Sequence, residues 1–241
     1  MFDLAEVRAI ANSQPGTKIN DVALAIVSGA LRKYLESKGD LPEESLVAAC
    51  PLNVRTDDSI DSDNMVSMMN TPLRTDVEDP LQRLQAVVEG SRRAKAFTET
   101  LGADTLTVIP MNLPAVIARG LLPPLMSLAV KIDAVSFNTM VSNVAGIQQP
   151  LYFCGARMVS MYGMGPIIDQ MGLFHAVFSY DGKITFTFTA CREMLPDPGV
   201  YAKCLQASYD ELKSAALKPR RKRPRKKKTT QKKANARKQT A

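Results

Sequence analysis

The hydrophobic pattern is clearest over residues 17–35, where apolar side chains recur at steps of three and four. This spacing places them on one side of an α-helix and leaves the charged residues on the other side. Asn20 or Asp21 is suited to cap the start of the helix, and Gly39 is suited to end it in a left-handed conformation. The pattern therefore predicts an amphipathic helix that packs on a sheet.

The same kind of spacing predicts three other helices. Residues 4–11 form a short helical run, which the Gln-Pro-Gly sequence of residues 14–16 ends. Asp79 is suited to cap a longer helix, and Pro80 is suited to its first turn. A last helix with an apolar face follows residues 196–198. Only one short helix thus precedes the amphipathic one, so we expect the chain to open within a larger fold.

Strands are predicted where apolar residues are continuous or alternate with polar ones. Residues 46–54 are almost entirely apolar, which is typical of a strand buried on both faces. Further strands are predicted over residues 64–72, 139–144, 156–162, 173–180 and 184–190. The last two form a hairpin, since Asp181 and Gly182 supply turn residues with positive φ. This order of elements indicates an α+β fold in which helices cover a mixed sheet.

The stretch from residue 101 to residue 132 is rich in Leu, Met and Pro, and its prolines divide it into short helices. A run of this kind more often covers a core than binds lipid, although the proline interruptions leave room for an apolar groove. Its longest apolar segment contains two prolines and is shorter than the ~20 residues that cross a bilayer.

Charge is distributed very unevenly along the chain. Residues 218–241 contain 13 of the 31 Lys and Arg residues and no acid, which leaves 18 basic against 24 acidic residues in 1–217, a net charge of −6. Apart from two prolines, the last 24 residues also lack any aromatic or aliphatic side chain larger than Ala. We therefore expect a globular part over residues 1–217 and a disordered basic tail over residues 218–241.

The cysteines and the chain start bear on the cellular compartment. Cys50, Cys154, Cys191 and Cys204 lie far apart, without a C-x-x-C pair or nearby His ligands. This pattern favours reduced, buried thiols in a cytosolic protein and gives no metal site. The first ten residues carry acids where a secretion signal has a basic and then an apolar run.

Six short motifs resemble those of a known family in their order and approximate spacing. They are Asn20-Asp21, PLNVR at residues 51–55, NMVS at 64–67, SNVAG at 142–146, PLY at 150–152 and YDG at 180–182. Each motif alone is weak, but together they resemble the C-terminal half of the bacterial wax ester synthase/diacylglycerol acyltransferase (WS/DGAT) family. The resemblance extends over residues 1 to about 217.

The resemblance implies a fold similar to the CoA-dependent acyltransferases such as chloramphenicol acetyltransferase, with a substrate tunnel between two α/β halves. It implies transfer of a fatty acyl group from acyl-CoA, a co-substrate, to diacylglycerol or a fatty alcohol, without a cofactor. In the family, a His of an HHxxxDG motif in the N-terminal half takes the proton of the attacking hydroxyl. This chain lacks that motif. We therefore expect it to be inactive alone and to need an N-terminal half as its partner.

His175 is the only histidine, and it matches no catalytic position of the family. It lies in a predicted strand of the hairpin, opposite in parity to Phe174 and Phe178. A hydrogen-bonded or half-exposed strand residue is therefore favoured over a catalytic one. No other catalytic residue is assigned.

The resemblance implies supporting roles at the substrate tunnel for Asn20, Asp21, Arg55, Asn64, Ser67, Ser142, Asn143 and Gly146. Helix capping explains Asn20 and Asp21 equally well. Arg55 is either a contact of the CoA phosphates or a solvated residue at a strand end.

Two of these motifs depart from the family pattern. Asp63 stands where the family has Gly before Asn64. A turn with positive φ tolerates Asp less well than Gly. Ala145 stands where the family has proline, and Ile and Gln follow Gly146. We expect a looser turn there.

The basic tail would be attracted to an anionic membrane surface. Together with lipid-soluble substrates, this favours a cytoplasmic protein associated peripherally with the inner membrane or lipid droplets. The alternative function is a non-catalytic lipid- or membrane-binding remnant of the same fold, tethered by its tail. Specific nucleic-acid binding is not expected, since the tail has no aromatic residues and residues 1–217 are acidic.

Overall fold

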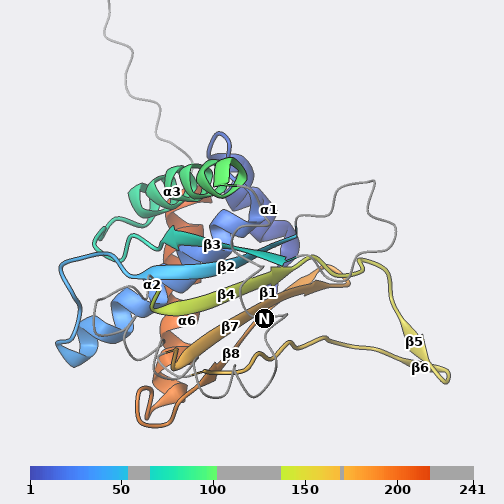
Figure 1. The fold of residues 1–241 in the computed structure, drawn as a ribbon. Helices are drawn as coiled ribbons and strands as arrows, with labels where there is room; N and C mark the ends of the chain where they lie inside the picture. Colours follow the sequence, from blue (N-terminus) through green and yellow to red (C-terminus); the bar gives the residue numbers. More distant parts are fainter. Residues whose placement is uncertain (54–65, 102–136, 169–170, 218–241) are drawn as a thin grey trace, which may run out of the picture.

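The structure is a computed structural model, and it describes residues 1–53, 66–101, 137–168 and 171–217 (Figure 1). The helices are α1 (Leu4–Ser13), α2 (Ile19–Lys38), α3 (Pro80–Leu101) and α6 (Pro198–Leu217). The strands are β1 (Phe2–Asp3), β2 (Val47–Asn53), β3 (Val66–Pro72), β4 (Thr139–Val144), β5 (Tyr152–Phe153), β6 (Ala156–Arg157), β7 (Leu173–Tyr180) and β8 (Lys183–Ala190).

Six of these strands form one mixed sheet in the order β1-β8-β7-β4-β2-β3. The central strands β7, β4 and β2 are parallel, and the outer pairs β1–β8, β8–β7 and β2–β3 are antiparallel. The carboxyl ends of the three parallel strands therefore lie at the same end of the sheet. The predicted α+β fold with a mixed sheet is confirmed.

The main core lies between the helices and one face of the sheet (Figure 1). Side chains of α1, α2, α3 and α6 pack there against Val141 of β4, Val177 of β7 and Ile184 of β8. We call this side the helix-covered face. The second face carries a smaller cluster of residues from β4, β7 and adjoining segments, centred on Phe174. Alternation along the strands separates the two sets of side chains.

The predicted helix is present as α2, but residues 21–31 are buried on all sides, so it is amphipathic only in its last turns. Its start also differs from the prediction. Lys18 is the N-cap, and Asp21 lies in the first turn, where its carboxylate accepts a hydrogen bond of 2.8 Å from the Lys18 N–H. Asp21 thus accepts a hydrogen bond from a backbone N–H at the helix start while it is itself a residue of the helix. The prediction had placed Asn20 or Asp21 at the N-cap position instead. Gly39 ends the helix with φ of 75°, as predicted.

Two other local predictions are confirmed. The carboxylate of Asp79 accepts hydrogen bonds from the N–H groups of Leu81 and Gln82, at 3.0 and 2.9 Å, at the start of α3. The turn of the β7–β8 hairpin has positive φ at Asp181, 44°, and Gly182, 76°.

Two predictions are wrong in part. A strand over residues 156–162 is present only as β6, because the following segment packs across the second face of the sheet. The cysteines are free, but only Cys50 is buried: Cys191 and Cys204 are half-buried, and Cys154 is exposed at a hairpin turn. The expectations for residues 102–136 and for the tail lie outside the described residues.

Candidate functional site

A hydrogen bond joins two of the motifs that the sequence keeps far apart. The Asn143 side-chain amide, at the end of β4, donates to Oδ1 of Asn20, at the start of α2, over 3.2 Å. Both side chains are half-buried. The contact therefore places the amino end of a helix at the carboxyl ends of parallel strands, the position where open α/β sheets most often bind ligands.

Other predicted residues lie at the same end of the sheet. Ser67 of β3 pairs with Leu52 of β2, and the pairing of Ala49 with Met140 places Leu52 level with Asn143. The side chain of Ser67, and all of Arg55 and Asn64, lie outside what the structure describes.

Ser142 and Asn143 are neighbours in one strand, but they face opposite sides. Ser142 is paired with Ala176 and is half-buried on the second face of the sheet, whereas Asn143 points to the helix-covered face. Only Asn143 can therefore reach the start of α2, and Ser142 is left to line the second face.

Asp21 is buried beside this contact and is already engaged in capping α2. Burial raises the pKa of its carboxyl, and this outweighs the opposite effect of the hydrogen bond from the Lys18 N–H. The capping interpretation thus accounts for Asp21, and its role at a substrate tunnel stays a prediction.

Side-chain hydrogen bonds hold the turn after β4. The Gly146 N–H and the Gln148 side-chain amide both donate to the Ser179 hydroxyl, at 3.1 and 3.0 Å. Gln148 also accepts from the Gly182 N–H over 3.2 Å. A Cβ at Gly146 would come within 3.0 Å of the Ser179 carbonyl oxygen. The side chains of Gln148 and Ser179 therefore fix this turn, and the expectation that it is looser than the family's stays a prediction.

Ser179 and Gln148 are the residues of this region that sequence reasoning missed. Gln148 was visible only as a departure from the family motif, and Ser179 precedes the YDG motif without being part of it. Their partners lie about 30 residues away in the chain, so no local pattern indicated them.

His175 is a hydrogen-bonded core residue, in line with its favoured interpretation, and it is not half-exposed. Its ring is 1% exposed on the helix-covered face. Nε2 lies 2.7 Å from the Tyr201 hydroxyl, and Nδ1 lies 3.2 Å from the Thr139 hydroxyl. The Thr139 hydroxyl donates to the Leu173 carbonyl, so Nδ1 carries the proton and Nε2 accepts from Tyr201. Burial lowers the pKa of His175 to about 4.

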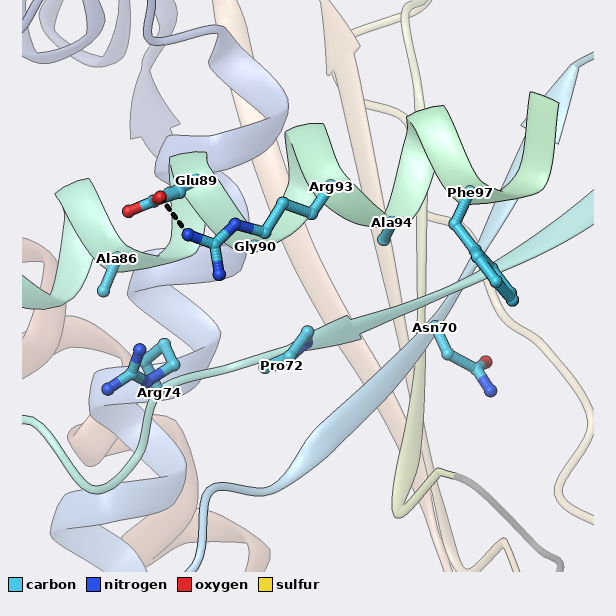
Figure 2. A pocket seen from close by; sticks show the side chains of 9 residues that line it. All are labelled: Asn70, Pro72, Arg74, Ala86, Glu89, Gly90, Arg93, Ala94 and Phe97. Carbon is cyan, nitrogen blue, oxygen red and sulfur yellow. Dashed lines mark hydrogen bonds and ion pairs between the residues drawn. The ribbon is translucent and has the colours of Figure 1, made fainter. Parts of the chain in front are cut away.

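A cavity of about 340 Å³ lies away from these residues, between α3 and the edge strand β3 (Figure 2). Gly90, Phe97 and Pro72 line it, together with two arginines. Those arginines are already paired, Arg93 with Glu89 and Arg74 with Asp76. The cavity contains none of the predicted site residues, and we assign it no function.

Two properties of the described part of the chain bear on the class of protein. No three His, Cys, Asp or Glu side chains there lie close enough to hold a metal ion. None of the helices in that part is both long and apolar enough to span a membrane.

Known proteins match this chain over nearly all of its globular part. The profile of the WS/DGAT C-terminal domain matches residues 62–213. The putative diacylglycerol O-acyltransferase Rv3480c of Mycobacterium tuberculosis is 35% identical over 220 residues, 89% of this chain and 43% of that protein. The O-acyltransferase WSD of Acinetobacter baylyi is 36% identical over 203 residues, 81% of this chain and 41% of that protein.

Solved structures agree with these sequence matches. The wax ester synthase/diacylglycerol acyltransferase of Marinobacter aquaeolei VT8 has a TM-score of 0.68 and 28% identity, over 89% of this chain and 47% of that one. The epimerization domain of tyrocidine synthetase B has a TM-score of 0.51 at 11% identity, over 90% of this chain and 47% of that one, and shows the fold alone. The chain thus spans about half the length of the relatives that it matches. It belongs to the WS/DGAT family and contains the family's C-terminal domain.

Proposed function

We propose that this chain forms one side of the acyl-transfer site of an O-acyltransferase that takes fatty acyl groups from acyl-CoA. The acceptor is the hydroxyl of diacylglycerol or of a fatty alcohol, and the product is a triacylglycerol or a wax ester. The observation that carries the proposal is the Asn143–Asn20 contact at the carboxyl ends of the parallel strands, in a chain of this family.

The division of labour follows from the chemistry of the described residues. A neutral hydroxyl is a weak nucleophile, so a base must take its proton as the oxygen attacks the thioester carbonyl and the CoA thiolate leaves. His175 cannot serve, because both ring nitrogens are engaged in the core. We therefore assign the base to the N-terminal half of the longer enzyme. Asn20 and Asn143 orient the substrates from this side, and Ser142, on the opposite face of the sheet, stays a predicted supporting residue.

The test is an assay of acyl transfer from palmitoyl-CoA to diacylglycerol and to hexadecanol. We expect no turnover from the chain alone. We expect turnover when the chain is joined to the segment of the Acinetobacter baylyi WSD enzyme that precedes the matched region. In this chimera, Asn143→Ala should lower kcat/KM by about tenfold or more. Asn70→Ala is the matched control, since Asn70 is an exposed asparagine of the same sheet. Robust turnover by the chain alone would overturn the proposal.

The basic tail favours a second function, alone or together with the first, namely attachment to an anionic membrane surface. Each Lys or Arg near such a surface contributes about 1 kcal/mol, so the 13 basic residues of the tail suffice for attachment. This would place the protein at the cytoplasmic side of the inner membrane or on lipid droplets. A non-catalytic membrane-binding protein is the alternative to the enzyme.

Cosedimentation with vesicles that contain phosphatidylserine tests the tail. We expect binding that weakens with salt and is lost from a chain that ends at Leu217. Equal binding by the shortened chain would exclude the tail as the attachment site. An inactive chimera that still binds vesicles through the tail would favour the non-catalytic alternative.

A further inference from the structure

The last turns of α3 present an aromatic ring and two arginines to solvent. Phe97 is 66% exposed, and Arg92 and Arg93 are exposed close to it in the helix. Arg93 and Phe97 are one turn apart and both border the cavity of Figure 2, so they share one side of α3. The buried side chains of this helix, such as Leu84 and Val87, lie on its other side in the core. We call the outward group of Arg92, Arg93 and Phe97 the α3 surface.

The two arginines of the α3 surface are available to an anionic partner. Arg93 pairs with Glu89, but the two side chains are 76% and 51% exposed, and an exposed pair of this kind contributes little to stability. Its guanidinium can therefore turn to another anion at small cost. Among the described residues, no ion pair involves Arg92. Cations beside an exposed aromatic ring suit the surface of an anionic bilayer, where the cations meet the headgroups and the ring enters the acyl boundary.

The basic tail begins close to α3. A side-chain nitrogen of Arg83, at the start of α3, lies 3.8 Å from the carboxylate of Glu211 in α6, and Figure 1 shows α6 reaching α3. From Glu211 the helix continues for only about 9 Å to its end at Leu217, where the tail follows. A tail that is bound to a membrane would therefore bring α3 toward the same membrane.

We propose that the α3 surface is a second membrane-contact site, through which the folded part of the chain docks on an anionic bilayer. The tail attracts the chain to the bilayer by charge. Phe97 then enters the boundary between headgroups and acyl chains, and Arg92 and Arg93 bind lipid phosphates. Because diacylglycerol dissolves in the bilayer, docking through α3 orients the enzyme over a membrane that contains its acceptor. This inference rests on the proposed attachment of the tail to a membrane.

The sequence contains no tryptophan, so Phe97→Trp places a single fluorescent reporter in the α3 surface. The probe is vesicles of phosphatidylcholine and phosphatidylserine with brominated acyl chains, added to the full chain. We expect the emission to move to shorter wavelength. Bromine near the headgroup should quench it more than bromine near the methyl end, because an interfacial ring lies about 5–10 Å deep. Tyr162→Trp is the matched control and should not respond, since Tyr162 is 60% exposed and precedes Gly163, which lies on the second face of the sheet against Phe178.

A second set of variants tests the charges. Arg92→Gln together with Arg93→Gln, in the Phe97→Trp background, should raise the lipid concentration at half-maximal quenching by about fivefold or more, because two cations near the lipid phosphates are lost. Arg192→Gln together with Lys203→Gln removes the same charge from exposed positions around the start of α6, at the opposite end of that helix from the tail. This control should change the half-maximal concentration by less than about twofold, since salt screens charges that are distant from the bilayer.

The outcomes separate this inference from the proposed attachment of the tail. Quenching of the Phe97→Trp variant that persists in a chain ending at Leu217 supports the α3 surface and counts against the tail. Cosedimentation of the full chain without a change in emission supports the tail and refutes the α3 surface. A full chain that does not cosediment refutes both. A shift of emission without vesicles, in the chimera or in a sample that light scattering shows to be dimeric, would assign the surface to the N-terminal half or to a second copy and would also refute it.

Discussion

His175 should make the stability of this protein depend on pH in a way that a single substitution removes. In the folded protein burial lowers its pKa to about 4, from an ordinary value of 6.5. Between these values the unfolded chain binds a proton that the folded protein excludes. The contribution of the neutral His175 ring to the unfolding free energy is therefore fully present above pH 6.5 and is lost as the pH falls toward 4.

The size of the effect follows from the two pKa values. The full difference corresponds to about 3 kcal/mol of unfolding free energy, and about 2 kcal/mol of it is lost by pH 5. The ring is enclosed, so solvent does not screen this contribution appreciably. Carboxyls with lowered pKa, such as those of Asp76 and Asp197, add a further loss in acid.

Urea unfolding followed by circular dichroism, at about pH 7.5 and pH 5, measures the effect. The control is His175→Gln, which keeps an acceptor for the Tyr201 hydroxyl but cannot take up a proton. Both proteins share the loss from the carboxyls. The parent should lose about 2 kcal/mol more than the variant between the two pH values. Parallel losses would refute the argument and would mean that the imidazole ring is hydrated in the folded protein.

Two substitutions test other parts of the structure. Gly146→Ala should lower the unfolding free energy by about 1–3 kcal/mol, because the new methyl group would press on the Ser179 carbonyl. Thermal unfolding followed by calorimetry measures this loss, and an unchanged Tm would contradict the close approach. Tyr201→Phe should cost about 1–3 kcal/mol in urea unfolding, since it leaves Nε2 of His175 buried without its donor, and a neutral result would show that this hydrogen bond does not stabilise the fold.

Local chemistry decided most of the secondary structure. Three features depend only on residues that are close together in the sequence. They are the apolar spacing in α2, the Asp79 carboxylate at the start of α3 and the Asp181-Gly182 turn. Predictions at these places are therefore confirmed. The strand expected over residues 156–162 is mostly absent, and the glycines that follow it, Gly163 and Gly165, lie against rings supplied by the distant strand β7.

The site depended on contacts between distant parts of the chain. The Asn143–Asn20 bond spans 123 residues, and the Gln148 side chain bonds the Ser179 hydroxyl only because β7 brings Ser179 beside it. The sequence by itself determined the helices, the hairpin turn and the resemblance to a family, because periodicity, capping and motif order are local properties. Only the tertiary structure decided which motif residues meet and which apolar side chains stay exposed, because these depend on how the sheet and helices pack.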